Sequence, residues 1–157
     1  MRRFQIYLDT SVLNFFFERE DLEKVNSTRE LFQEIRRGKF LAYISDLVLR
    51  EIDKASAGKK LNLLSLVRSY DLPILELTPE CLLLAEKYMA RKIFPVKYRD
   101  DGLHVAAAAV HRMDIVVTWN LRHMVKIRTK REVKAVNLFE GYPEIEICTP
   151  LEVIEND

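Results

Sequence analysis

The sequence predicts an α/β protein in which a mainly parallel central sheet is covered by helices on both faces. Short segments rich in β-branched and aromatic residues alternate with longer helical segments along the chain, and this alternation is typical of βαβ units. A chain of 157 residues has single-domain length, and 48% hydrophobic residues can fill one core. Glycines and prolines are scattered singly rather than gathered in a linker, so we expect one domain over residues 1–157.

The first third of the chain predicts a strand, a turn and a helix. Residues 4–8 (FQIYL) predict a strand that ends at Asp9. Residues 11–17 predict a short helix or turn. Residues 21–37 place their apolar side chains on about one face of a helix, and Gly38 is positioned to end it.

The next segment repeats this order. Residues 40–44 (FLAYI) predict the second strand, after which Ser45 can cap a helix that contains Glu51. Residues 60–70 predict another helix, and residues 73–77 (PILEL) predict a short strand.

The region after residue 77 predicts two helices. Thr78 and Pro79 are typical of a helix start, and this helix continues to Met89. Residues 93–97 predict a loop. Residues 99–112 predict a helix because they contain a run of four alanines.

The last region predicts two strands and two helical segments. Residues 115–118 (IVVT) predict a buried strand, residues 122–134 a turn followed by a helix, and residues 144–148 a last strand. Thr149 and Glu152 have the spacing of a capping box, which predicts a short final helix.

Polar residues directly follow two of the expected strands. Asp9 follows residues 4–8, and Trp119 and Asn120 follow residues 115–118. In parallel sheets ligands bind beyond the carboxyl ends of the strands, so these positions can share one cleft.

Acidic residues far apart in the sequence could converge on that cleft, namely Asp9, Glu51 and the pair Asp100 and Asp101. Convergent carboxylates are what a hard divalent cation requires, and such a cation can activate water for phosphodiester hydrolysis. These acids also have structural interpretations. Asp9 can cap the next helix, Glu51 can be a surface residue near Lys54, and the aspartate pair is favoured at a helix N-terminus.

Three further polar residues lie beside these acids in the sequence. Thr10 and Ser11 follow Asp9 and are, like it, good helix caps. His104 lies three residues after Asp101 and so on its face of the helix. His104 can be a hydrogen-bonded structural residue or a metal ligand, although oxygen ligands suit Mg²⁺ or Mn²⁺ better than imidazole.

The segments YLDTSVL, LREI, DGLHVAAAAV and VVTWNLRHM, in this order over residues 4–124, resemble the PIN domain family. The resemblance is strongest to the VapC-like toxins of prokaryotic toxin–antitoxin pairs. It implies a Rossmann-like, three-layer α/β/α fold and a ribonuclease that depends on Mg²⁺ or Mn²⁺. It places Asp9, Glu51 and Asp101 on the acidic metal-site positions of the family, and Thr118 on a small hydroxyl residue.

The chain departs from the family at Asn120, where an aspartate is common. An amide oxygen can coordinate a metal ion but adds no charge. The sequence therefore leaves open whether one or two ions bind.

Residues 122–134 contain six basic residues and a single acid, Glu132. Such a run can be a solvated helix face, or it can flank the cleft and neutralise RNA phosphates through Arg122, Lys126 and Arg128. The net charge is only +1, so a polyanion has to be attracted by a local patch. Trp119 could stack on a base or lie half-buried.

The remaining composition predicts a cytoplasmic protein. Cys81 and Cys148 match no metal-binding spacing, and we expect them as small apolar residues in a reducing compartment. No secretory signal and no apolar run of about 20 residues are visible, so no membrane partner is expected.

The sequence thus favours a metal-dependent endoribonuclease that acts as a toxin, in which Asp9 and Asp101 bind the ion and Glu51 binds it through water or acts as base. The expected partners are RNA, a cognate antitoxin and a second copy of the chain. Residues 15–17 and 82–89 could supply apolar interfaces or simply fill the core. The alternative is a non-catalytic PIN-like module that binds RNA or a protein, and Asn120 keeps this alternative open.

Overall fold

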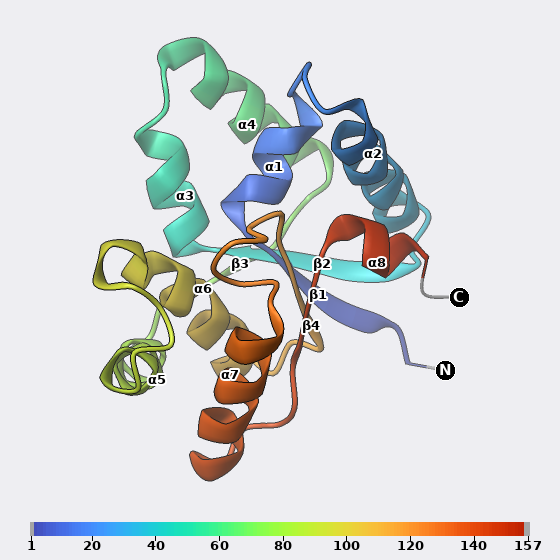
Figure 1. Ribbon diagram of the computed structural model, residues 1–157. Helices are drawn as coiled ribbons and strands as arrows, with labels where there is room; N and C mark the ends of the chain where they lie inside the picture. The colour runs from blue at the N-terminus through green and yellow to red at the C-terminus, as the bar shows by residue number, and fades with distance from the viewer. Residues whose placement is uncertain (1, 156–157) are drawn as a thin grey trace.

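Five parallel strands form the central sheet in the order β3-β2-β1-β4-β5, with β1 in the middle (Figure 1). The computed structural model describes residues 2–155. All four strand pairings are parallel, which confirms the predicted sheet. The strands are β1 (Phe4–Leu8), β2 (Phe40–Ser45), β3 (Ile74–Leu75), β4 (Ile115–Val117) and β5 (Glu146–Cys148).

Helices cover both faces of this sheet. They are α1 (Thr10–Phe16), α2 (Leu22–Arg36), α3 (Asp46–Asp53), α4 (Ala57–Ser69), α5 (Pro79–Ala90), α6 (Arg99–Val110), α7 (Ile127–Phe139) and α8 (Pro150–Ile154), with a 3₁₀ turn η1 (Val96–Tyr98). Figure 1 shows α1, α2 and α8 on one face and α5, α6 and α7 on the other. The expected three-layer α/β/α architecture is therefore confirmed.

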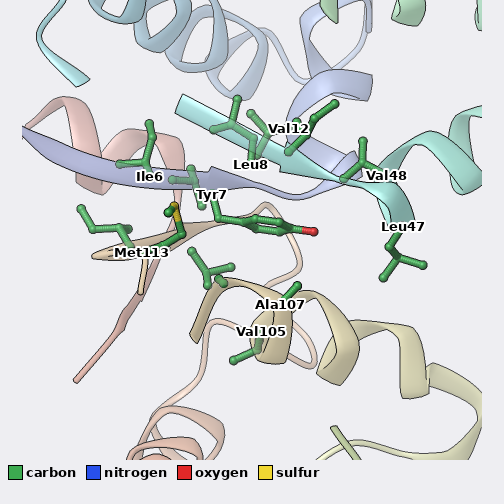
Figure 2. Packing of buried hydrophobic residues seen from close by; sticks show 14 of the residues in the cluster. Ile6, Tyr7, Leu8, Val12, Leu47, Val48, Val105, Ala107 and Met113 are labelled. Carbon is green, nitrogen blue, oxygen red and sulfur yellow. The ribbon is translucent and has the colours of Figure 1, made fainter. Parts of the chain in front are cut away.

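The central strand β1 is covered on both sides, and Ile6, Tyr7 and Leu8 are fully buried. Because side chains alternate along a strand, Ile6 and Leu8 point to the face that also holds Val12 of α1. Tyr7 points to the opposite face, toward the helix that carries Ala107 (Figure 2). Strands buried on both faces read as continuous apolar runs, which explains the sequence IYL at the buried end of β1.

Helix α6 is buried around its whole circumference over residues 102–109. Its alanines allow the backbone to approach the sheet and α5 closely, because each adds little volume. The helix ends at Val110 rather than at residue 112 as predicted, since Arg112 adopts a left-handed conformation with φ of +59°.

Two aromatic and apolar segments that could have formed interfaces behave differently. Phenylalanines 15–17 are half-buried and pack against core rings that include Phe32 and Trp119. On α5, by contrast, Leu82 and Leu83 are 51% and 66% exposed. The phenylalanines therefore fill the core, and α5 leaves apolar surface open.

Most other expectations agree with the structure to within a few residues. The predicted capping box is present, since Thr149 Oγ1 accepts from the Glu152 amide at 3.2 Å and Glu152 Oε1 accepts from the Thr149 amide at 3.0 Å. The predicted loop at 93–97 runs into η1, and α4 begins at Ala57 instead of residue 60.

Within residues 2–155, no helix has the length and apolar character needed to cross a membrane.

Replacing Gly102 in α6 with alanine should destabilise the protein although alanine favours helices. The added Cβ would lie 2.9 Å from the Phe94 ring, which is buried, and overpacking of this kind costs about 1–3 kcal/mol. This cost exceeds the helix-propensity gain of about 0.5–1 kcal/mol. Gly58 in α4 has no atom within 4 Å of such a Cβ, so Gly58→Ala is the matched control. Thermal melts should show a lower Tm for Gly102→Ala and an unchanged or higher one for Gly58→Ala; equal shifts would contradict this packing.

Candidate functional site

Asp9 is the first residue after β1 and the N-cap of α1. Its Oδ1 accepts from the Ser11 amide at 2.9 Å and from Ser11 Oγ at 2.5 Å, and its Oδ2 accepts from Thr118 Oγ1 at 2.7 Å. The side chain is buried, and within residues 2–155 it forms no ion pair with a lysine or arginine. The capping interpretation is thus correct, and it leaves a buried carboxylate held only by neutral donors.

The same hydroxyl groups fix the segment that follows β4. Ser11 Oγ accepts from the Trp119 amide at 2.9 Å, and Thr118 Oγ1 accepts from the Asn120 amide at 2.9 Å. Ser11 and Thr118 therefore join the end of β1 to the end of β4. The expectation that these two strand ends share one site is met by these bonds.

Asp101 lies in the first turn of α6 and is held by Asn120. Asn120 Nδ2 donates to Asp101 Oδ2 at 2.9 Å, while Asn120 Oδ1 accepts from the His123 amide at 2.9 Å. In the opposite amide orientation, Asn120 Oδ1 would face Asp101 Oδ2, and Asn120 Nδ2 would face the His123 amide N–H. Asn120 thus turns its nitrogen, and not its oxygen, toward Asp101.

The electrostatics show that the acids influence one another. Burial, followed by the negative charge of Asp9, raises the pKa of Asp101 from 3.8 to about 6. Glu51 raises it further, whereas His104 and the hydrogen bond from Asn120 act in the opposite direction. Carboxylates that repel each other in a partly dry site bind a cation more favourably than isolated ones.

Glu51 reaches the same region from α3. Its Oε1 accepts from Thr10 Oγ1 at 2.7 Å and from His104 Nε2 at 2.6 Å. Burial raises the pKa of Glu51, but the hydrogen bond and the charge of His104 outweigh burial, so the pKa is lowered overall. Lys54 has the smallest of these effects. Glu51 therefore faces inward and is not the surface residue that its position near Lys54 allowed.

His104 is buried and uses both ring nitrogens. Nε2 contacts Glu51, and Nδ1 lies 2.6 Å from the Tyr7 hydroxyl. Burial lowers the pKa of His104, whereas the hydrogen bond with Glu51 and the charge of Asp9 raise it, and the net effect is a raised pKa. The structure thus assigns His104 the hydrogen-bonded position, one of the two alternatives that the sequence left open.

The side chains of two candidate residues, Asp100 and Trp119, point away from the three acids. Asp100 lines a small cleft between α5 and α6, together with Leu82 and Met89, and so points away from the acids. Trp119 is buried and donates from Nε1 to Thr28 Oγ1 at 2.8 Å. The tryptophan ring is therefore not free to stack on a base.

The basic run of residues 122–134 follows the loop that carries Asn120. Arg122 and Lys126 are exposed. Burial has the largest effect in lowering the pKa of His123, and the positive charges of Arg122 and Lys126 lower it further. The His123 ring stacks on Tyr98 with centroids 4.3 Å apart. Arg128 is exposed on α7 and pairs with Glu132 at 3.4 Å. Arg122 and Lys126 are thus the basic residues nearest in sequence to the site, and their contact with RNA stays a prediction.

The donor set fits a hydrated divalent cation better than a closed metal cage. Within residues 2–155, no group of three or more histidine, cysteine, aspartate or glutamate side chains is arranged so that it could hold a metal ion. Mg²⁺ usually keeps several waters and needs only one or two carboxylates, which Asp9 and Asp101 can supply. Oxygen donors also match Mg²⁺ or Mn²⁺ rather than softer metals. The oxygen donors of Asp9 and Asp101 are thus of the kind that Mg²⁺ or Mn²⁺ takes, and a bound ion stays a prediction.

The fold is shared with solved toxin–antitoxin structures. A chain of the VapBC2 complex from Rickettsia felis, bound to promoter DNA, is 15% identical with a TM-score of 0.58, covering 92% of this chain and 98% of that one. A chain of DNA-bound VapBC from Salmonella typhimurium is 22% identical with a TM-score of 0.55, covering 94% and 98%. A chain of VapBC-5 from Mycobacterium tuberculosis is 15% identical with a TM-score of 0.50, covering 92% and 98%.

The chain shares the fold of these chains from VapBC structures. No protein-family model matches the sequence, and no curated protein matches it either. At identities of 15–22% the likeness concerns the fold, so an argument about activity has to rest on the side chains of the site.

Sequence reasoning missed Tyr7 and Ser45 as residues of the site, although the Tyr7 hydroxyl contacts both Ser45 and His104. The Tyr7 hydroxyl lies 2.7 Å from Ser45 Oγ. The available signal was the tyrosine near the end of the first strand, since a buried phenol needs a hydrogen-bond partner.

The variant Asp101→Asn should stabilise the protein in EDTA at neutral pH but not in acid. Because the fold raises the pKa of Asp101 from 3.8 to about 6, the native state favours the protonated carboxyl. This stability is present below pH 4 and is lost as the pH rises through 6. Asparagine cannot ionise, so its Tm advantage should appear at pH 7.5 and vanish near pH 4. A Tm difference that does not change with pH would contradict the repulsion between the acids.

Proposed function

We propose that this protein is a Mg²⁺- or Mn²⁺-dependent endoribonuclease of the VapC-like toxin type. The observation that carries the proposal is the gathering of Asp9, Glu51 and Asp101 at the carboxyl edge of the sheet, where the charge of Asp9 helps to raise the pKa of Asp101. Mutual repulsion of this kind is expected where carboxylates are arranged to share a cation. The fold supports the proposal because it is shared with chains of VapBC structures.

The contacts of the three acids suggest two different roles, ion binding and proton acceptance. Asp9 and Asp101 would hold the ion, which when bound supplies a more acidic water and stabilises charge on the phosphate. Glu51 has its Oε1 tied to Thr10 and His104, whereas Oε2 has no hydrogen-bond donor among the described residues. With its side chain 29% exposed, Glu51 can accept a proton from the attacking water through Oε2.

Substrate binding would fall to residues outside the acidic site. The exposed Arg122 and Lys126 flank the Asn120 loop, and Arg128 follows on the first turn of α7. Positive side chains here would neutralise RNA phosphates that three carboxylates would otherwise repel.

A small cognate antitoxin and a second copy of the chain are the proposed protein partners, and the proposed location is the cytoplasm. The support is the fold shared with chains of VapBC complexes, together with exposed apolar side chains on α5 and α7. Leu83, Leu138 and Phe139 are 66%, 75% and 88% exposed, and such side chains often mark interfaces. Light scattering at micromolar concentration tests the second copy, and a monomeric mass would refute it.

The activity is tested by single substitutions in the acids. Asp9→Asn and Asp101→Asn should each reduce RNA cleavage by at least about 100-fold, since even residues behind metal ligands contribute 10–100-fold. EDTA should abolish the wild-type cleavage. The matched control is Asp100→Asn, the same change at the neighbouring position that faces α5, and it should retain cleavage.

Circular dichroism establishes that each variant is folded before cleavage is compared. A folded Asp9→Asn or Asp101→Asn variant with wild-type cleavage would refute the proposal, as would wild-type cleavage that EDTA does not affect. Mn²⁺ and RNA binding without cleavage by the wild type would favour the non-catalytic module instead.

Asn120→Asp should make the protein less stable in EDTA and increase its stabilisation by Mn²⁺. The substitution replaces an N–H donor 2.9 Å from Asp101 Oδ2 with a carboxylate oxygen, so the acids repel each other more strongly without metal. A bound cation offsets this repulsion, and binding to the native state raises Tm. Paired melts in EDTA and in Mn²⁺ measure both effects. The same metal-induced Tm shift in both proteins would place Asn120 outside the metal site.

A further inference from the structure

A buried chain of hydrogen bonds lies behind Glu51. From Glu51 Oε1 it passes to His104 Nε2 at 2.6 Å, from His104 Nδ1 to the Tyr7 hydroxyl at 2.6 Å, and from there to Ser45 Oγ at 2.7 Å. Tyr7 and Ser45 are fully buried, and His104 is 3% exposed. Figure 2 shows the Tyr7 hydroxyl at the end of a ring that lies between β1 and α6.

This chain begins on α3 and ends at the N-cap residue of α3, which is also the last residue of β2. Ser45 is the N-cap of α3 and accepts from the Leu47 amide at 3.2 Å, while Glu51 lies further along α3. The chain thus joins Glu51 to the N-cap of α3 through one residue of β1 and one of α6. Rotation or sliding of α3 relative to the central strand would break at least one of these bonds.

With a protonated His104, Nδ1 donates to Tyr7 and Tyr7 donates to Ser45 Oγ; with a neutral His104 the donors and acceptors fit the opposite direction along the chain. An ionised Glu51 can only accept, so His104 Nε2 donates in both cases. In the neutral case Ser45 Oγ, which already accepts from a backbone amide, gives its own hydrogen to the Tyr7 oxygen, and Tyr7 then donates to His104 Nδ1. In either direction both hydroxyls and both ring nitrogens have partners, as buried polar groups require.

The geometry points to His104, oriented by Tyr7, as the positioning residue for Glu51. A glutamate side chain has several rotamers and loses conformational entropy when it is fixed. His104 and Thr10 both hold Oε1, so Oε2 alone is left for the ion or its water. His104 itself touches neither, because both of its nitrogens are occupied. This inference rests on the proposed function. It names His104 as the residue that holds Glu51 in the orientation that this function needs.

The test compares two buried tyrosines. Tyr7→Phe removes the hydroxyl that orients His104, and Tyr88→Phe is the matched control. Tyr88 is also fully buried, and its hydroxyl donates a hydrogen bond of 2.5 Å to Oδ1 of Asn137 on α7. A purely structural role predicts similar losses in Tm and no change in metal binding for either variant. Positioning predicts that only Tyr7→Phe weakens Mn²⁺ binding, by about 10-fold, and slows RNA cleavage by about 10–100-fold.

Two changes at His104 separate positioning from bulk packing. His104→Gln retains an N–H group that can reach Glu51 Oε1, whereas His104→Leu fills the space without a donor. His104→Gln should therefore keep more of the Mn²⁺ affinity and cleavage than His104→Leu. Each value is measured on protein shown to be folded by circular dichroism, with Mn²⁺ affinity taken from calorimetry without RNA.

The outcomes separate the two proposals. Wild-type Mn²⁺ affinity and cleavage in both Tyr7→Phe and His104→Leu would overturn the positioning role. A wild type that binds Mn²⁺ but does not cleave RNA would overturn the proposed function, while the affinity differences would still decide the role of His104. A wild type that binds no Mn²⁺ would overturn both.

Discussion

Burial of Asp9 at the end of the central strand is the constraint on which the rest of the site depends. Because β1 lies between β2 and β4, its carboxyl end is enclosed by Ser45 on one side and Thr118 on the other. An ionised carboxylate there has to be satisfied by hydrogen bonds, and the protein supplies only neutral donors to it, from Ser11 and Thr118. Its negative charge is therefore left to act on the neighbouring acids.

Asp101 and Glu51 receive hydrogen bonds from different kinds of donor, and this difference is the basis of their separate proposed roles. Asp101 receives a neutral amide N–H from Asn120, and its pKa rises to about 6. Glu51 receives an imidazole N–H from His104, and its pKa falls. A cation would most benefit the Asp9–Asp101 pair, whereas Glu51 is held as an ionised carboxylate beside it. The fold provides the strand ends, and these side-chain contacts are the basis of the proposed chemistry.

The sequence was sufficient for features that depend on local pattern. The β-branched strand at residues 115–118 and its alternation with helices predicted the parallel sheet, and the position of Asp9 after the first strand predicted the edge at which the acids meet. Features that depend on helix rotation or on distant partners were not predictable. Local pattern does not distinguish Asp100 from Asp101; the family resemblance selected Asp101, and the packing of α6 gives the physical reason. The burial of Trp119 depends on Thr28, which is 91 residues away.

The central claim is that the three acids form a divalent cation site. Its most direct test is a titration of the wild-type protein with Mn²⁺ in the absence of RNA, followed by calorimetry and by thermal melts. We predict saturable binding that Mg²⁺ displaces, together with a Tm that rises with Mn²⁺ concentration because the ion binds the native state. The absence of saturable binding, with a Tm that Mn²⁺ leaves unchanged, would contradict the claim.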